Sequence, residues 1–243
     1  DNTSVGNSSM QANTSGASNT AVGSQALMAN TTASQNTAVG YQTLYTNTVT
    51  SSMTAVGYQA LYANTTGSDN VAVGWQSMYA NTNGYEGVAL GNQTLYSNTG
   101  GQRNTAIGHN VLRSNSTGND NCGVGWYALR PTTGNSNTAV GSAAGTNITS
   151  GAGNSILGYG AGSSLTTGIY SVYIGNSTTA SSGGASYEVV IGGGAGGSTG
   201  KGTTTGYINP NGGGVYQGNN SSSWSTTSDF RLKKNIVDNT EGL

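Results

Sequence analysis

The stretch "NTAVG" at residues 36–40 recurs along the chain at a fixed spacing. Its glycine, Gly40, has counterparts at a 17-residue period, which is broken only by one 16-residue step between Gly125 and Gly141. Self-similarity at a short fixed period predicts a repeat architecture in which each copy stacks on the next. We call these residues the closing glycines: Gly6, Gly23, Gly40, Gly57, Gly74, Gly91, Gly108, Gly125, Gly141, Gly158, Gly175 and Gly192.

The positions around each closing glycine repeat almost as regularly. An aliphatic residue lies one position before the glycine, and asparagine lies four positions before it in eight copies. Leucine or methionine follows by four residues in most copies, tyrosine by five in the middle copies, and asparagine by seven in the first seven copies. We name these the aliphatic, entry-asparagine, leucine, tyrosine and inner-asparagine positions. Around Gly40 they are Val39, Asn36, Leu44, Tyr45 and Asn47.

Each copy predicts one coil of an all-β solenoid. The alternation in "NTAVG" is that of a strand, with Thr and Val on one side and Ala and Gly on the other. "QTLY" at residues 42–45 predicts a second short strand, and the Asn-Thr and Gly-Ser stretches predict turns. Coils stacked at about 4.8 Å would form a rod about 58 Å long. We expect the aliphatic column to form its dry core and the asparagines to hydrogen-bond along their column.

One Leu and one Val per coil make a thin core for a free-standing rod, so we expect several chains, most simply three, to share a core. The pattern changes after Gly141, where Gly145 and Gly162 occupy the leucine position and the coil is expected to thin. We place the repeat shaft at residues 1–192, a Gly/Ser-rich neck of short β segments outside the 17-residue register at 193–227, and a separate module at 228–243.

The composition limits the classes of function. Charged residues make up 6% of the chain, against about 25% in a typical soluble protein. The net charge of -1 argues against nucleic-acid binding, and no apolar run is long enough for a membrane span. The single cysteine, Cys122, excludes an intrachain disulfide framework. His109 has no second histidine near it, so we expect no metal site and no cofactor.

Glycan hydrolysis needs two carboxylates about 5–10 Å apart. Before residue 228 the acids are Asp1, Asp69, Glu86, Asp120 and Glu188. Asp69 and Glu86 are separated by one full repeat and are expected on adjacent coils. We interpret these acids as surface loop residues and predict no enzyme activity apart from the self-cleavage considered below.

Aromatic residues are the best candidates for recognition. The residue after the closing glycine, which we name the aromatic position, is Tyr41, Tyr58, Trp75 and Trp126 in four copies, and we predict that these four bind a ligand. Stacked aromatic rings on a polar rod suit sugar rings. The column of Tyr45, Tyr62, Tyr79 and Tyr96 is interpreted instead as packing between chains.

The "NTAVG" coils resemble the left-handed parallel β-roll repeats of trimeric autotransporter adhesin heads, and similar rolls occur in phage tail fibres. The 17-residue coil is longer than that family's usual repeat. The resemblance covers residues 1–192 and implies a homotrimer whose rolls pack along a three-fold axis.

The stretch "SDFRLKKNI" at 228–236 carries four charges in nine residues, unlike the chain before it. It resembles the start of the intramolecular chaperone domain that ends endosialidase-type phage tail spikes and many tail fibres. That resemblance implies that the domain assists trimerisation and is then released by self-cleavage. Carried over, Ser228 would be the nucleophile, Lys233 would activate it, and the bond between Ser228 and Asp229 would be cut.

We therefore expect a trimeric phage tail fibre shaft, extracellular on the virion, that contacts other tail proteins and a host-surface glycan or protein receptor. A cellular trimeric adhesin stalk is one alternative. An ice-binding solenoid is another, since threonine columns such as Thr20, Thr37 and Thr54 are regular, although Val71 and Cys122 interrupt them. A polysaccharide-degrading spike is disfavoured by the scarcity of acids.

Overall fold

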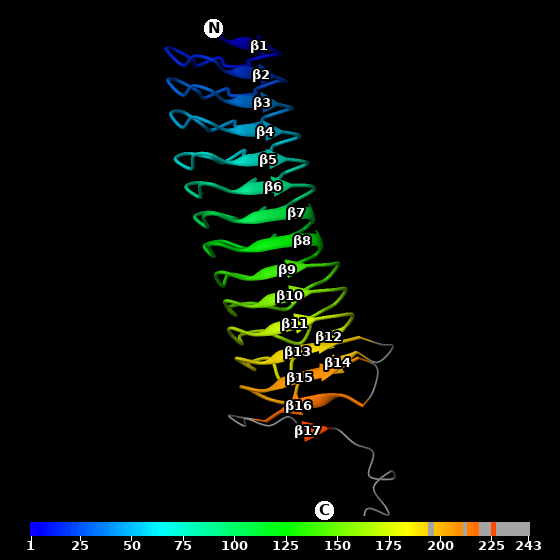
Figure 1. The fold of residues 1–243 in the computed structure, drawn as a ribbon. Helices are drawn as coiled ribbons and strands as arrows, with labels where there is room; N and C mark the ends of the chain where they lie inside the picture. Colours follow the sequence, from blue (N-terminus) through cyan, green and yellow to red (C-terminus); the bar gives the residue numbers. More distant parts are fainter. Residues whose placement is uncertain (194–196, 211–212, 219–224, 227–243) are drawn as a thin grey trace, which may run out of the picture.

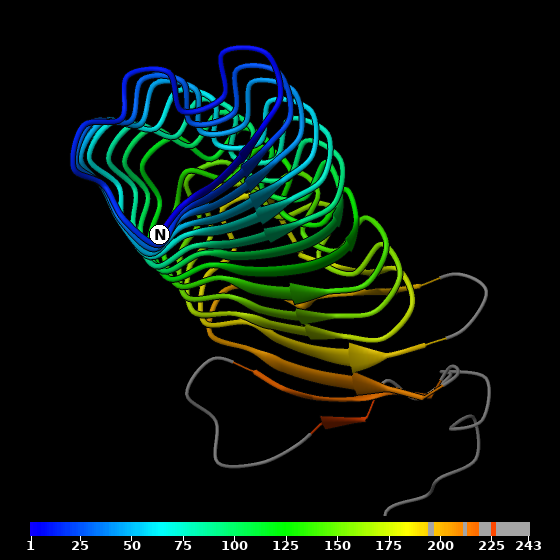
Figure 2. The same cartoon turned by 90° about the horizontal axis from the view of Figure 1, so that it is seen from above.

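The computed structural model describes residues 1–193, 197–210, 213–218 and 225–226. Within these residues the chain is all-β and contains no helix, which confirms the predicted fold class. About twelve coils stack into a parallel β-solenoid, with one strand of the main sheet above the next (Figure 1). Viewed from above, the coils nearly superimpose and drift slowly from one to the next (Figure 2).

The strands are short. They are β1 (Thr3–Val5), β2 (Thr20–Val22), β3 (Thr37–Val39), β4 (Thr54–Val56), β5 (Val71–Val73), β6 (Val88–Leu90), β7 (Thr105–His109), β8 (Cys122–Trp126), β9 (Thr138–Val140), β10 (Ser155–Leu157), β11 (Val172–Ile174), β12 (Thr178–Thr179), β13 (Val189–Gly192), β14 (Ser198–Thr199), β15 (Gly206–Asn209), β16 (Val215–Gln217) and β17 (Ser225–Thr226).

The register of the main sheet follows the sequence period. Strands β1 to β11, β13 and β15 pair in parallel, and equivalent residues face each other, as Thr37 faces Thr54. The single 16-residue step leaves this register intact, because Val124 still pairs with Val140. This coil is therefore one residue shorter in its loop. Thr132 and Gly134 make the same hydrogen bonds as their equivalents in other coils, so the deletion lies between them.

The predicted second strand in each coil is wrong. Residues such as 42–45 are turn, although their backbone hydrogen-bonds from coil to coil, for example Leu44 N–H to Ala60 C=O (3.1 Å). The reason is conformational. Gln42 (φ 52°) and Leu44 (φ 51°) are left-handed, and a left-handed residue breaks the side-chain alternation of a strand. The segment therefore forms bends and not an extended chain.

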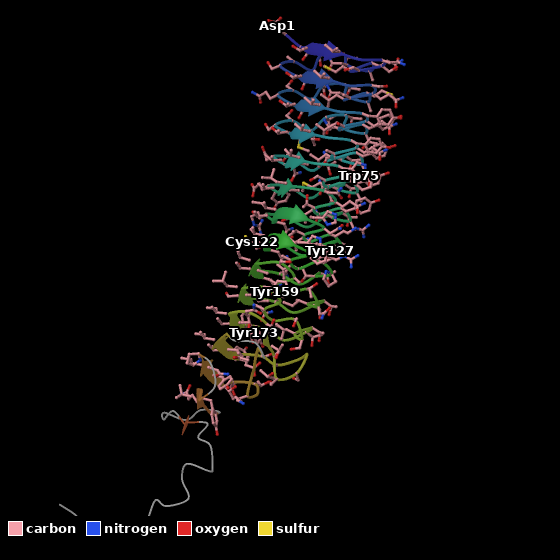
Figure 3. The ribbon with its side chains drawn as sticks, turned by 90° about the vertical axis from the view of Figure 1, so that its right-hand side faces the viewer. Asp1, Trp75, Cys122, Tyr127, Tyr159 and Tyr173 are labelled. Atoms are coloured by element: carbon pink, nitrogen blue, oxygen red, sulfur yellow. The ribbon has the colours of Figure 1, made fainter. Side chains whose placement is uncertain are left out.

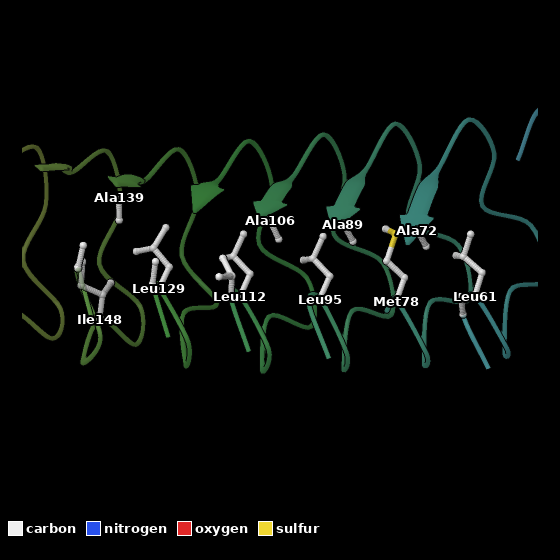
Figure 4. Close-up of a cluster of buried hydrophobic side chains, with 14 of the residues drawn as sticks. Leu61, Ala72, Met78, Ala89, Leu95, Ala106, Leu112, Leu129, Ala139 and Ile148 are labelled. Carbon is white, nitrogen blue, oxygen red and sulfur yellow. The ribbon is translucent and has the colours of Figure 1, made fainter. Parts of the chain in front are cut away.

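The core differs from the predicted one. The alanine of the strand and the leucine position point inward, and the aliphatic position points outward and remains half-buried to exposed. Leu95 and Ala106 have no exposed surface, and Figure 4 shows how such side chains meet between successive coils. The prediction of an aliphatic core column is wrong because the strand's buried face carries alanine, which leaves room for the larger leucine from the opposite wall.

Two columns of buried asparagine line the coil interior, and the predicted hydrogen bonding along the columns is confirmed. At the inner-asparagine position, Asn81 Nδ2 donates to Asn64 Oδ1 (2.9 Å) and Asn98 Nδ2 donates to Asn81 Oδ1 (2.7 Å). At the entry position, Asn36 Oδ1 accepts from the Met53 backbone N–H (3.0 Å). Because each amide serves the next coil, the columns satisfy buried backbone groups that the short strands leave unpaired.

The closing glycines are required by close approach as well as by conformation. Gly57 has φ 132°, a backbone angle that other residues rarely adopt. A Cβ at Gly57 would lie 2.4 Å from the carbonyl oxygen of Gly74 in the next coil. The positive φ of this column continues through Gly175. The last closing glycine, Gly192, pairs with Asn209 in the next coil.

The 17-residue register extends one coil beyond the predicted end at residue 192. Val190 of β13 pairs with Tyr207 of β15, its equivalent one repeat later, in the same parallel sheet. The sheet then turns antiparallel through β16 and β17, and β12 and β14 form a separate two-stranded sheet. The predicted chaperone start at 228–243 lies outside the described residues.

Glu188 contradicts the interpretation of all the acids as surface residues. It occupies the entry-asparagine position of β13 and has no exposed surface. Its carboxylate accepts hydrogen bonds from the Tyr173 hydroxyl (2.9 Å) and from the backbone N–H groups of Ser181 (3.1 Å) and Gly202 (2.9 Å). A buried carboxylate needs such donors. Because Gly202 belongs to the predicted neck and Tyr173 to β11, Glu188 links the neck to the last coils by hydrogen bonds.

Candidate functional site

Three neighbouring columns form the candidate recognition face. They are the aromatic position, the residue after it, which is Gln25, Gln42, Gln59, Gln76 and Gln93 in five coils, and the tyrosine position. The predicted site residues Tyr41, Tyr58, Trp75 and Trp126 are 43%, 43%, 44% and 54% exposed. The structure thus places all four at the surface, and it brings the first three into contact.

The glutamine column fixes the spacing of the face. Gln42 Nε2 donates to Gln25 Oε1 (2.8 Å), and the pattern repeats from Gln59 to Gln42 (2.8 Å) and onward to Gln93. Each side-chain amide bonds along the rod axis, as buried or half-buried amides do in stacked β structures. The column therefore forms a rigid strip between the two aromatic columns.

The tyrosine column consists of rings stacked on each other. Tyr45 and Tyr62 have centroids 5.1 Å apart and planes 4° apart, and the stack continues through Tyr79 to Tyr96. The two faces of an inner ring are therefore covered by neighbouring rings, and its edge and hydroxyl face outward. Burial, reinforced by the neighbouring phenols of Tyr79, Tyr45 and Tyr41, raises the pKa of Tyr62. Tyr41 belongs to the aromatic position, so the two aromatic columns lie close together.

The aromatic position is also partly self-stacked. Tyr41 and Tyr58 have centroids 5.5 Å apart and planes 16° apart, and Tyr58 and Trp75 are 6.4 Å and 15° apart. Sugar rings stack on aromatic faces, so stacking within the column removes much of the surface that the prediction relied on. Trp75 ends this stack, because the next residue in the column is Asn92.

Trp126 lies three coils further along the same column, apart from the other three predicted residues. Its neighbours in the column are His109 and Ser142, neither of which stacks on it. Its ring centroid lies 3.8 Å from that of Tyr127, and the planes cross at 68°. Trp126 therefore keeps indole surface that no parallel ring covers.

Two arginines replace tyrosine where the tyrosine column ends, and the sequence analysis did not single them out. The Arg113 guanidinium lies 4.9 Å from the Tyr96 ring centroid, and its Nε donates to Gln93 Oε1 (3.2 Å). The Arg130 guanidinium lies 4.8 Å from the Tyr127 ring centroid. Within the described part of the chain, no carboxylate pairs with either guanidinium. The sequence did contain a signal for them, because Arg113 and Arg130 are two of the few cations in the repeats and both occupy the tyrosine position.

The remaining acids lie at a different position of the coil, five residues before the closing glycine. Asp69 and Glu86 occupy it in adjacent coils, as predicted, and both are exposed. Arg103 and Asp120 follow in the same column and form an ion pair (2.7 Å), which lowers the pKa of the Asp120 carboxyl. These side chains therefore form a single column on the loop surface of the rod.

The outer face of the main sheet carries a long apolar stripe. Its side chains are half-buried or exposed, as at Val73 (36%) and Ile107 (38%), and none is charged. Threonine, valine and Cys122 form a second column beside it, three residues before the closing glycine. In Figure 3, Cys122 lies at the edge of the rod formed by the strands, and Trp75 and Tyr127 lie toward the other edge. We name as the sheet stripe Val5, Val22, Val39, Val56, Val73, Leu90, Ile107, Val124, Val140, Leu157, Ile174, Ile191 and Ile208.

The remaining candidates are the self-cleavage residues, a metal site and a surface depression. Ser228 and Lys233 lie outside the described residues, so the self-cleavage prediction stays a prediction. Among the residues that are described, no three His, Cys, Asp or Glu side chains gather closely enough to hold a metal ion. A shallow depression lined by Gln11, Ala12, Met28 and Ala29 lies beside the first two coils and contains no charged or aromatic side chain.

Comparison with known proteins gives no relative from which to transfer a role. No protein-family model, no curated protein and no solved structure matches the chain. The described part of the chain also holds no helix long and apolar enough to cross a membrane. The function must therefore be argued from the surface of the solenoid itself.

Proposed function

We propose that this chain is the shaft of a homotrimeric attachment fibre, of the kind that phages carry on their tails. The observation that supports this most directly is the sheet stripe. Its aliphatic side chains follow one another from Val5 to Ile208 without a charged residue. An extended apolar surface of this kind marks an interaction site in soluble proteins.

Identical copies of this chain are the best occupants of the stripe. At about 4.8 Å per coil, the twelve steps of the stripe span about 58 Å, so an occupant must be as long as the rod. Two other copies in parallel register supply stripes of the same length and period. Because the stripe has no charge, three copies bring no repeated like-charge contacts together. Closed three-fold association also leaves no apolar sheet face exposed.

The rest of the surface suits an adhesive function. Charges are few, no carboxylate pair forms an enclosed site among the described residues, and the aromatic face is repeated along the rod. A trimer presents this face three times, so weak contacts to a host-surface glycan or receptor gain from multivalency. The resemblance of residues 228–236 to a tail-fibre chaperone start agrees with a fibre that is assembled as a trimer.

The trimer is tested by the mass of the full chain in solution. We expect light scattering to give three times the chain mass of 24.2 kDa. The double variant Val73→Lys/Ile107→Lys places cations on the stripe and is expected to be monomeric or aggregated, whereas Thr66→Lys, at an exposed position outside the stripe, remains trimeric. Cys122, half-buried beside the stripe, should react with a maleimide faster in the double variant. A monomeric wild type would overturn the proposal.

Self-cleavage is tested separately. The intact mass of full-length wild type is compared with that of Ser228→Ala. We expect loss of a C-terminal fragment beginning at Asp229 in the wild type alone. Equal masses would remove the maturation step and leave the trimer proposal standing.

Ice binding is the second candidate, because one observation favours it. The Thr20, Thr37 and Thr54 side chains lie in register beside the stripe on a parallel sheet. The same face cannot both bind ice and pack against two other chains. Measurable thermal hysteresis in a monomeric wild type would therefore favour ice binding, and a trimer without hysteresis would exclude it.

A further inference from the structure

The coils of β7 and β8 depart from the repeat on their outer surface. These are the strands that extend through the aromatic position, so that His109 pairs with Trp126. Beneath them, Val111 fills space that Gly123 leaves, since a Cβ at Gly123 would lie 2.5 Å from Val111 Cγ1. The backbone that carries the outer side chains is thus paired and tightly packed, which is what a binding site needs from its scaffold.

This surface gathers aromatic, amide and cationic groups from one chain. Trp126 has uncovered ring surface, and the Tyr127 ring lies 5.8 Å from that of His109 at 52°. Arg130 lies over Tyr127, and Arg113 leans toward Gln93 and Tyr96 on the preceding coil. Both guanidiniums keep N–H groups for an outside acceptor, because no carboxylate in the described residues pairs with them.

A buried amide provides a second, independent observation. Asn110 is 6% exposed, and its Oδ1 has no hydrogen-bond partner. Its Nδ2 lies 2.9 Å from His109 Nδ1, so the exposed His109 ring lies next to the unpaired oxygen. A buried acceptor that lacks a donor is unfavourable. A ligand hydroxyl admitted by movement of His109 would supply the missing donor.

We propose that this surface is a binding site for an acidic saccharide, a sugar unit carrying a carboxylate or a sulfate. The proposal rests on the attachment function proposed above and names the ligand class. We define the β7–β8 site as His109, Asn110, Arg113, Trp126, Tyr127 and Arg130.

The chemistry of each group fits such a ligand. Guanidinium N–H groups bind the oxygens of a carboxylate or sulfate in charge-assisted hydrogen bonds. The uncovered Trp126 ring offers an apolar platform for the C–H face of the sugar, and Asn110 and His109 can bond its hydroxyls. The Tyr41, Tyr58 and Trp75 stack lacks an arginine, and its faces are largely covered, so recognition concentrates at β7–β8.

The test measures binding of three hexasaccharides by calorimetry to the full chain: hexagalacturonate, a heparin hexasaccharide and neutral maltohexaose. We expect binding of at least one acidic hexasaccharide and weakening with added salt. The Arg113→Gln/Arg130→Gln variant and the Trp126→Ala variant should each lose affinity by at least about tenfold. The matched controls are Arg103→Gln, which removes an exposed cation already paired with Asp120, and Tyr170→Ala, which removes an exposed ring outside the three columns of the recognition face. Both controls should stay within about twofold of the wild type.

Several outcomes would overturn the site. They are no binding of either acidic hexasaccharide, equal binding of maltohexaose, equal loss in Arg103→Gln, or an affinity for inorganic sulfate that matches that of the sugars. Far-ultraviolet circular dichroism of each variant checks that the solenoid is folded. The oligomeric state is measured on the same samples. Because one chain supplies the whole site, a monomer that binds would refute the trimer alone, and a trimer that does not bind would refute the site alone.

Discussion

The coils of β2 to β8 and those of β9 to β13 share one backbone register but fill their interiors differently. In the first set the interior is leucine or methionine against alanine, as in Leu95 against Ala106. In the second set, Gly145 occupies the leucine position, and the volume comes from Ile156 on the next strand and Ile148 on the loop. The predicted thinning of the C-terminal coils is therefore compensated by side chains from other positions.

The two sets also differ in backbone strain. The leucine position is left-handed from Met10 to Gly162, with φ 49° at Leu95 and 59° at Gly145. A left-handed conformation costs an L-residue about 1–2 kcal/mol and glycine almost nothing. The first set accepts that cost because full burial of a leucine contributes about 2–3 kcal/mol. The second set avoids it and buries apolar groups from less strained positions.

The inner-asparagine column ends one coil before the second set begins. After Asn115 the same position is Thr132, then Ile148 and Leu165, all fully buried. The parallel strand register nevertheless continues without a shift. What the two sets keep in common is the closing-glycine column, the entry-asparagine bonds through Asn154 and the coil-to-coil backbone hydrogen bonds. These three features, and not one particular core, therefore hold the register.

Substitution of a closing glycine should have the largest effect. Gly57→Ala combines a forbidden φ of 132° with a Cβ 2.4 Å from a backbone oxygen that cannot move alone. We expect the free energy of unfolding to fall by at least about 4 kcal/mol, or the chain to fail to fold. Thermal melts followed by circular dichroism measure the effect. The matched control is Gly160→Ala, where φ is 59° and the nearest atom to a Cβ is Ser177 Oγ at 3.7 Å. That variant should lose only about 1–2 kcal/mol, and equal losses would contradict the argument.

Replacing a leucine–alanine pair of the first set by the glycine–isoleucine pair of the second should reveal coupling between the two positions. Leu95→Gly removes a fully buried leucine and should cost about 2–4 kcal/mol, partly offset by relief of the left-handed strain. Adding Ala106→Ile reproduces the pair formed by Gly145 and Ile156 and should recover about 1–2 kcal/mol. Ala106→Ile alone should destabilise by overpacking. If thermal melts show that the losses of stability caused by the two substitutions simply add, then isoleucine does not replace the volume of the missing leucine and the interpretation is wrong.

Breaking the asparagine column should cost somewhat less. Asn81→Ile leaves Asn64 Oδ1 without its donor and removes one of the two acceptors of Asn98 Nδ2, which keeps the Gly101 carbonyl, and we expect a loss of about 2–3 kcal/mol. The equivalent position in the second set is Ile148, where Ile148→Val should cost only about 1 kcal/mol. Equal stability of Asn81→Ile and wild type in urea unfolding would show that the column contributes nothing.

The sequence was sufficient for the period, the parallel register and the asparagine columns, because all three depend on residues spaced by one repeat. It was insufficient for the direction of side chains within a coil. Left-handed residues such as Gln42 and Leu44 reverse the alternation expected of a strand, so the aliphatic column was wrongly placed inside. The aromatic positions were predicted correctly as exposed. The stacking of aromatic rings in columns was also anticipated. The packing of the two arginines on tyrosine rings and the burial of Glu188 depend on contacts between coils that no single repeat shows.

Alkaline pH should produce the smallest effect, and we expect the second set to contribute more of it than Tyr62 of the first set. Tyr173 is fully buried, donates to Glu188, and burial next to that carboxylate raises its pKa from an ordinary value of 10.0. Above pH 10 the unfolded chain therefore releases a proton that the folded chain keeps. This contribution to stability is complete below pH 10 and is lost as the pH rises, by up to about 1.4 kcal/mol per pH unit.

Tyr173→Phe separates this contribution from that of the first set. At pH 7 the variant loses one hydrogen bond and about 1 kcal/mol. Between pH 7 and pH 11 its melting temperature should fall less than that of the wild type, because phenylalanine has no proton to release. The control Tyr58→Phe changes an exposed ring of the aromatic position in the first set and should keep the wild-type pH dependence. If both variants follow the wild type, the buried Tyr173–Glu188 contact does not set the alkaline limit, and the two sets of coils respond to pH alike.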